Sequence, residues 1–137
     1  MTFTTTYTVP IADINYGGHL GNDRPLALFN EARVQLLKSL GYTEIDIGGG
    51  RGIIMVESGV RYLKEVFHND LLQIEVAVSE LAEKKFVLDY QIARLPAQEP
   101  VLAGFTVFLG FDYEKRAVAR LPQSFSEALR IFQSDVP

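Results

Sequence analysis

The chain opens with alternating apolar and polar residues and then changes to a helical pattern. Residues 3–11 alternate between aromatic or aliphatic side chains and threonines, which predicts a half-buried strand. Residues 12–24 are polar and contain glycines, which is typical of a loop. Pro25 suits the first turn of a helix, because its missing N–H would be unpaired there. Apolar residues then recur at three- and four-residue steps, so we predict a long helix with one apolar face that Gly41 ends.

After this helix the pattern is typical of strands joined by short turns. The predicted strands cover residues 53–62, 72–78, 86–92, 101–111 and 117–121. Residues 101–111 are almost continuously apolar, which indicates a central strand buried on both faces. A short terminal helix through Phe132 follows, and Ser124 or Ser126 would cap it.

The order of these elements predicts the fold class. Hairpin connections impose antiparallel pairing, so one helix must cover an antiparallel sheet. We therefore predict one α+β domain over residues 1–137 with the hot-dog architecture. In that architecture a sheet of about five or six antiparallel strands wraps around one long central helix, here followed by a short C-terminal helix. A different α+β sandwich is the alternative.

Composition narrows the class of protein. A chain of 137 residues is long enough to bury a core. The net charge is −4 and the basic residues are scattered, which argues against a nucleic-acid partner. There is no cysteine, so disulfides and thiol nucleophiles are excluded, and a reducing cytoplasm is the expected location. No signal-peptide pattern is present, and no segment reaches the roughly 20 apolar residues of a membrane span.

The densest cluster of polar side chains directly precedes the long helix. Asp13, Asn15, His19 and Asn22 lie close together, with Gly18 between them. Ordering so many polar groups is costly unless they bind or react with something. We therefore predict the functional site here. The chain has two histidines, far apart in sequence, which is not a metal-ligand spacing, so no metal is expected.

This segment resembles a motif of the hot-dog thioesterases of the 4-hydroxybenzoyl-CoA type and of the related acyl-carrier-protein thioesterases. The matching positions are Asp13, His19, Asn22, Glu31-Ala32-Arg33, residues 60–64, residues 69–72 and Leu121-Pro122. The resemblance covers nearly the whole chain. It implies hydrolysis of the thioester of an acyl-CoA or an acyl-carrier protein, without a cofactor.

One position departs from the family motif. The second aspartate of the motif, usually the catalytic carboxylate, is Asn15 here, and an amide cannot accept a proton at neutral pH. The remaining candidates for a base are Asp13, His19 and Glu31, the last expected to be partly buried. Asn15 could still bind the thioester oxygen or position a water. Each candidate also has a structural interpretation: Asp13 could cap the loop, His19 could fix it, and Glu31 could pair with Arg33 or with a strand residue.

Four further residues are candidates for substrate binding. Gly18 and Asn22 lie where N–H groups at the beginning of the helix could stabilise an oxyanion. Arg61 and Lys64 could contact the nucleotide end of coenzyme A, although exposed basic residues on a strand are more often only solvated. The segment 48–52 lacks the Lys and Ser/Thr of a P-loop, so we interpret it as a plain loop.

We expect a homodimer, because pairing two edge strands removes an exposed sheet edge. The resemblance implies the same, often with two dimers joined, and it places the acyl chain between the central helix and its partner. Two other functions stay open. One is a hot-dog protein that binds acyl thioesters without hydrolysing them. The other is an enoyl-thioester hydratase or dehydratase, which also needs a histidine and a carboxylate.

Overall fold

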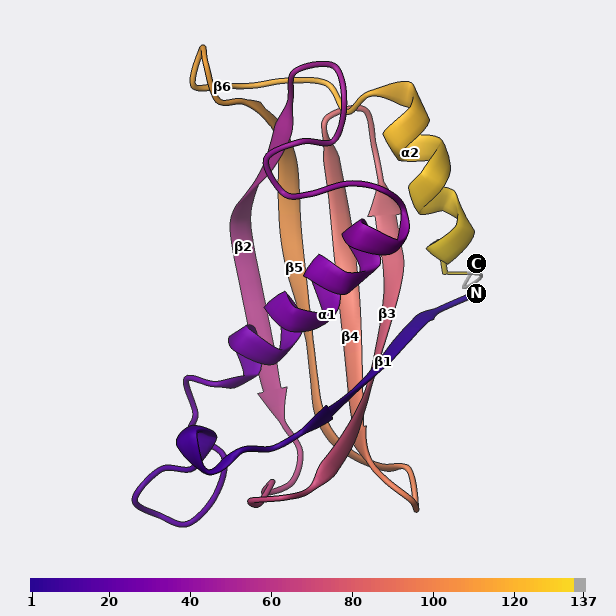
Figure 1. The fold of residues 1–137 in the computed structure, drawn as a ribbon. Coiled ribbons are helices and arrows are strands. Elements are labelled where there is room, and N and C mark those ends of the chain that lie inside the picture. The colour runs from indigo at the N-terminus through magenta and orange to yellow at the C-terminus, as the bar shows by residue number, and fades with distance from the viewer. Residues whose placement is uncertain (135–137) are drawn as a thin grey trace.

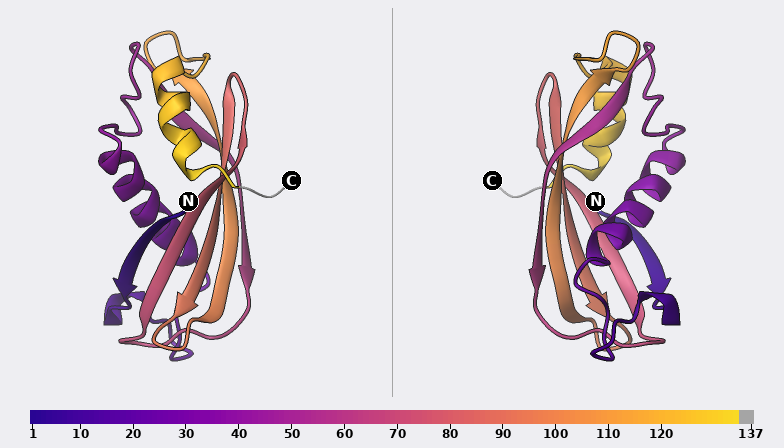
Figure 2. Two further views of the ribbon diagram at one scale, coloured as in Figure 1. Left: turned by 90° about the vertical axis from the view of Figure 1, so that its right-hand side faces the viewer. Right: turned by 90° about the vertical axis from the view of Figure 1, so that its left-hand side faces the viewer.

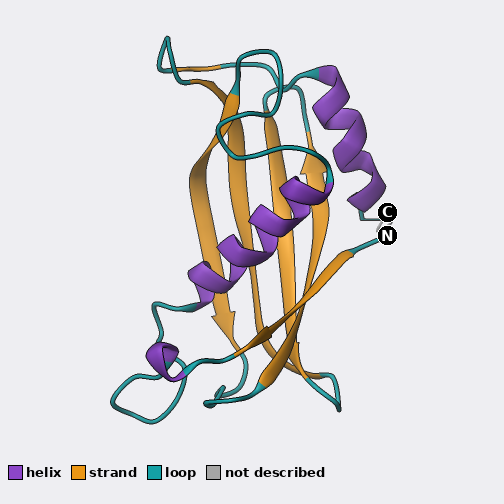
Figure 3. Ribbon diagram, viewed as in Figure 1, coloured by secondary structure: helices purple, strands orange, loops and turns teal. Residues whose placement is uncertain are grey.

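The fold is built on one antiparallel sheet. The computed structural model describes residues 1–134. The elements in chain order are β1 (Phe3–Thr8), η1 (Ile11–Asp13), α1 (Pro25–Ser39), β2 (Gly52–Tyr62), β3 (Leu71–Leu81), β4 (Lys85–Arg94), β5 (Glu99–Asp112), β6 (Ala117–Val118), α2 (Gln123–Leu129) and η2 (Arg130–Phe132). The strand order is β1-β3-β4-β5-β2, with β6 beside β5, and all pairs are antiparallel (Figures 1 and 3).

The two helices lie on the same face of this sheet, and α1 crosses the strands obliquely (Figures 1 and 2). Over the opposite face, residues 1–134 place no helix. This arrangement confirms the predicted α+β class and the long helix over an antiparallel sheet. Among the described residues, no helix combines the length and the apolar character that crossing a membrane requires.

The bounds of α1 follow from its sequence. Pro25 is the first helical residue, as predicted. The helix ends at Ser39, and Gly41 follows with φ +87°, a left-handed conformation that glycine adopts at little cost. Between these ends the apolar face is buried against the sheet. Its fully buried members include Leu28, Phe29, Ala32 and Leu36.

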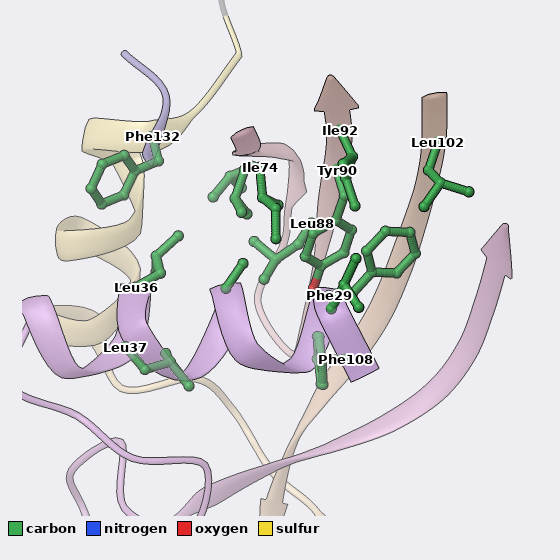
Figure 4. Packing of buried hydrophobic residues seen from close by; sticks show 14 of the residues in the cluster. Phe29, Leu36, Leu37, Ile74, Leu88, Tyr90, Ile92, Leu102, Phe108 and Phe132 are labelled. Carbon is green, nitrogen blue, oxygen red and sulfur yellow. The ribbon is translucent and has the colours of Figure 1, made fainter. Parts of the chain in front are cut away.

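The contact of α1 with the sheet is centred on Phe29. Its ring stacks on that of Tyr90 at 4.2 Å between centroids and 11° between planes (Figure 4). Gly104 in β5 leaves room for the Phe29 ring, since a Cβ there would lie 2.5 Å from it. The buried Tyr90 hydroxyl is satisfied by Thr106 at 2.7 Å. Aromatic stacking adds about 0.5–1.5 kcal/mol to the gain from burial itself.

Arg33 lies on the buried face of α1 because it has partners there. Its Nε donates to Glu44 Oε1 at 2.7 Å, and its guanidinium lies 4.9 Å from the ring centre of Phe108. It also donates to Asn30. Its ion-pair partner is thus Glu44, in the loop after the helix, and not Glu31. The buried guanidinium of Arg33 needs an opposite charge nearby, and its ion pair with Glu44 links that loop to the helix.

Three local predictions are wrong. β5 is not buried on both faces: its inward side is buried, but Ala103 and Phe105 are half-buried because no layer covers the outer face. Neither Ser124 nor Ser126 caps the terminal helix, because α2 begins at Gln123 directly after Pro122 and has no side-chain cap. The strands predicted over 3–11 and 117–121 end earlier, at Thr8 and Val118.

We predict that Gly104→Ala destabilises the fold by about 1–3 kcal/mol, as overpacking of a core does. The added Cβ would lie 2.4 Å from the backbone oxygen of Gly59 and 2.5 Å from the buried ring of Phe29, and neither can move freely. Urea unfolding followed by circular dichroism measures the loss.

Gly59→Ala is the matched control. Its Cβ would also meet an atom at 2.4 Å, but that atom belongs to the half-buried ring of Phe105, which can rotate away. A loss for Gly59→Ala equal to or larger than that for Gly104→Ala would contradict this account of the contact between α1 and the sheet.

Candidate active site

The polar segment before α1 forms a closed loop. Asn15 N donates to His19 O at 2.9 Å, and Gly21 N donates to Asp13 O at 3.0 Å. Leu20 N donates to Val66 O at 2.7 Å, which joins the loop to the chain that follows β2. These bonds bring Asp13, Asn15 and His19 together, as the sequence predicts, but each side chain takes a different environment.

Asp13 is buried, and its carboxylate is fully engaged by side chains. Oδ2 accepts a hydrogen bond from the Tyr7 hydroxyl, and Oδ1 pairs with Arg24 Nη2 at 2.9 Å. Burial and the bond to Asp13 raise the pKa of Tyr7 to about 12, so its hydroxyl stays protonated at neutral pH and remains a donor. Both carboxylate oxygens of Asp13 therefore have side-chain partners, from β1 and from the residue that precedes α1.

The side chains of Asn15 and His19 both lie next to Gly17. The amide Oδ1 of Asn15 accepts from Gly17 N at 2.9 Å, which leaves its NH₂ group as a donor. His19 Nδ1 lies 2.9 Å from Leu20 O; since a carbonyl only accepts, Nδ1 carries the hydrogen. In the neutral ring Nε2 is then the acceptor. A Cβ on Gly17 would lie 3.2 Å from His19 Nε2 and 3.3 Å from Asn15 Oδ1.

A cavity of about 270 Å³ opens beside His19. It lies between residues 19–22, the first turn of α1 at Pro25, and residues 62–66 after β2, with Leu102 also lining it. Asn22 and Lys64 line it as well, as two of the predicted binding residues. Asp13, Asn15 and Glu31 do not. Of the candidate bases, only His19 reaches this cavity.

Polar contacts hold several lining residues in place. The Tyr62 hydroxyl donates to Asn22 O at 2.6 Å, and both residues line the cavity. Lys64 Nζ pairs with Glu99 Oε2 at 2.7 Å, and Arg94 Nη2 with Glu99 Oε1 at 2.5 Å. Hydrogen bonds from Lys64 and Arg94 lower the pKa of Glu99, which keeps the network charged.

Other predicted residues lie away from the cavity. Glu31 is exposed, so the expectation of partial burial is wrong: it precedes the buried Ala32 by one position, which turns it off the apolar face of α1. Its carboxylate accepts from Gln35 Nε2 at 3.5 Å. Gly18 is exposed, with φ +81°. Arg61 is exposed on β2 and forms no ion pair within residues 1–134.

Three residues near the site, Tyr7, Arg24 and Glu99, were not predicted from the sequence pattern. For Arg24 a signal was present: a cation at the beginning of a helix opposes the helix dipole, so it needs another reason to be there. Tyr7 and Glu99 carried no such signal, because no local pattern indicates that Tyr7 contacts Asp13 or that Glu99 pairs with Lys64. In residues 1–134 no group of three His, Cys, Asp or Glu side chains is placed to hold a metal ion.

Comparison with known proteins identifies the family of this chain. A family model described as the thioesterase-like superfamily matches residues 9–129. No curated protein matches the chain in sequence.

Solved structures of similar fold are numerous, and three illustrate the range. A 1,4-dihydroxy-2-naphthoyl-CoA thioesterase from Synechocystis shares 21% identity at a TM-score of 0.86, covering 95% of this chain and 96% of its own. A Staphylococcus aureus hypothetical protein solved in complex with CoA shares 17% identity at 0.89, covering 100% and 89%. A gentisyl-coenzyme A thioesterase shares 20% identity at 0.81, covering 92% and 98%.

These likenesses show that the fold is the hot-dog fold, as predicted from the order of elements. The family match extends over most of the chain, from the end of β1 to the end of α2. This protein therefore belongs to the thioesterase-like superfamily.

Proposed function

We propose that this protein hydrolyses the thioester of an acyl-CoA, or of an acyl-carrier protein, to a free acid and a thiol. The observation that carries the proposal is His19: its Nε2 is the acceptor nitrogen of a ring that lines a cavity at the beginning of α1. Membership of the thioesterase-like superfamily supports the reaction class. The CoA bound to one similar structure, and the CoA thioesterase activity named for two others, support coenzyme A as the carrier.

His19 is the general base of this mechanism. Its Nε2 takes a proton from a water, whose oxygen attacks the thioester carbonyl carbon. Negative charge then develops on the carbonyl oxygen. When the tetrahedral intermediate collapses, the C–S bond breaks, and the imidazolium returns the proton to the leaving thiolate. No cofactor is consumed.

The developing oxyanion needs stabilisation, and the attacking water needs a group that holds it. Asn22 and Pro25 border the cavity at the beginning of α1. Pro25 has no N–H, so the backbone N–H of Asn22 is the candidate donor there, and the dipole of the helix favours negative charge. The NH₂ group of Asn15, free of the bond that occupies its Oδ1, can hold the attacking water close to His19. Losing one oxyanion donor typically costs an enzyme about 10²–10³-fold in kcat.

We also propose a homodimer in the cytoplasm, which can assemble further into a dimer of dimers. β1 and β2 are the end strands of the described sheet, and β2 is the longer, with 11 residues against 6. Val56 on β2 is 53% exposed, beside a β-bulge. Pairing two copies along β2 would satisfy its open edge and cover this apolar side chain.

A second candidate function is binding of acyl thioesters without hydrolysis. Two observations favour it: Asn15 replaces the family carboxylate, and the nearest carboxylate, Asp13, is already held by Tyr7 and Arg24. Binding of acyl-CoA with no thiol release from aliphatic or aromatic substrates of any length would select this alternative.

His19→Ala is predicted to lower kcat/KM by about 10²–10⁴-fold, the usual contribution of a general base. Thiol release from a panel of short, long and aromatic acyl-CoAs measures it.

The matched control is His68→Ala, which removes the other histidine. His68 is exposed and does not line the cavity, so its replacement should leave kcat/KM within about twofold. Full activity of the His19 variant, or an equal loss in both variants, would refute the assignment of His19.

Val56→Lys is predicted to convert the dimer to a monomer, because a charge on an edge strand opposes edge pairing. Sedimentation velocity measures the change in mass. Ile131→Lys is the control: Ile131 is 50% exposed on η2, away from β2, and its replacement should leave the dimer intact. A Val56→Lys protein that stays dimeric would place the interface elsewhere.

A further inference from the structure

We infer that Tyr7 and Arg24 are positioning residues, which act through the carboxylate of Asp13 to hold His19 in place. We call the three side chains the Asp13 clamp. The inference rests on the proposed function, because it assigns the clamp to the same site. None of the three lines the cavity, so none is placed to touch a substrate there.

The clamp joins three elements that are separate in the chain. Tyr7 belongs to β1, where it pairs with Leu72 of β3, so its position is set by the sheet. Asp13 ends η1, and Arg24 directly precedes α1. The buried carboxylate accepts the Tyr7 hydroxyl on one oxygen and pairs with Arg24 Nη2 at 2.9 Å on the other. One side chain therefore sets the distance from the sheet edge to the beginning of the helix.

The backbone connects the clamp to His19. Gly21 N donates to Asp13 O, and Arg24 N donates to Gly21 O, both at 3.0 Å. Gly21 is thus bonded to two members of the clamp and lies two residues from His19. The carbonyl that fixes the His19 ring is that of Leu20, which directly precedes Gly21. If Asp13 or Arg24 moved, Leu20 O would move with Gly21, and the imidazole would lose its fixed orientation.

Electrostatics explains why Arg24 is present at this position. A cation beside the first turn of α1 is unfavourable with the helix dipole, and no acidic residue lies in that turn to offset it. The compensation comes from Asp13, whose own burial is costly without a charged partner. Each group of the clamp therefore depends on the other two.

A general role in stability is the competing interpretation, since the clamp also joins β1 to the helix region. A second contact between the same two elements separates the roles. Thr5 Oγ1 donates to Gln35 Oε1 at 2.7 Å, which links β1 to α1 further along the helix. Within residues 1–134, the side-chain hydrogen bonds of Thr5 and Gln35 go to each other and to Glu31, and none goes to the loop of His19. Thr5→Val removes this bond and leaves the clamp intact.

The experiment compares Tyr7→Phe, Arg24→Met, Arg24→Lys and Thr5→Val in the full chain. Tyr7→Phe and Arg24→Met are expected to lower kcat by about 10- to 100-fold, the effect of a small misplacement of a catalytic group. KM should change by less than about twofold, because no cavity contact is lost. Arg24→Lys keeps the charge and should recover much of kcat. Thr5→Val should lower stability and leave kcat unchanged.

A second readout does not depend on turnover. Nitrogen NMR of the imidazole ring reports which nitrogen of His19 carries the proton. The wild-type protein and Thr5→Val should show the proton on Nδ1, and Tyr7→Phe and Arg24→Met should show a mixture of both forms. An unchanged His19 spectrum with unchanged kcat in the two clamp variants overturns the inference, and so does a loss of kcat in Thr5→Val equal to theirs.

The two proposals fail in different ways. If the wild-type protein releases no thiol from any substrate, or if His19→Ala is fully active, the proposed hydrolysis fails, while the NMR comparison still decides whether the clamp orients the ring. If His19→Ala is inactive and Tyr7→Phe and Arg24→Met keep the wild-type rate and spectrum, only the clamp is refuted.

Discussion

The packing of α1 against the inner face of the sheet is the contact on which the rest of the structure depends. Phe29 stacked on Tyr90 sets the position of the helix over β4, and the absence of a side chain at Gly104 lets it approach. The hydrophobic effect supplies the driving force, at about 25 cal/mol per Å² of apolar surface buried. Because α1 begins at the cavity, this packing also places one wall of the site.

The site combines a buried carboxylate, Asp13, with a half-buried imidazole, His19, which is the proposed base. Asp13 satisfies its carboxylate inside the protein, with Tyr7 and Arg24, and so orders the loop. His19 uses Nδ1 for a hydrogen bond to Leu20 O within the loop, and its ring lines the cavity. A carboxylate with two side-chain partners is a poor base, and the amide of Asn15 cannot act as a base at all. The proposed chemistry therefore depends on the imidazole of His19.

Much of the fold follows from local patterns, and the exceptions have physical reasons. Helical periodicity located α1, with Pro25 at its beginning and Gly41 after its end, because both signals act within one turn. The apolar run of 101–111 was misleading, since side chains on an uncovered sheet face can bury one another in part without any layer above them. The expected burial of Glu31 failed because one helical position, about 100°, separates the buried face from solvent.

Sequence alone predicted the order of strands and helices along the chain, and it singled out the polar segment before α1 as the candidate site. Periodicity and residue type are local properties, so they can be read without a fold. The choice of a candidate base among Asp13, His19 and Glu31 required the tertiary structure, because it depends on residues that are distant in the chain. The Tyr7 hydroxyl donates a hydrogen bond to the Asp13 carboxylate, and residues 62–66 line the cavity beside His19. Burial and hydrogen bonding to distant residues decide which group is free to react, and no local pattern encodes them.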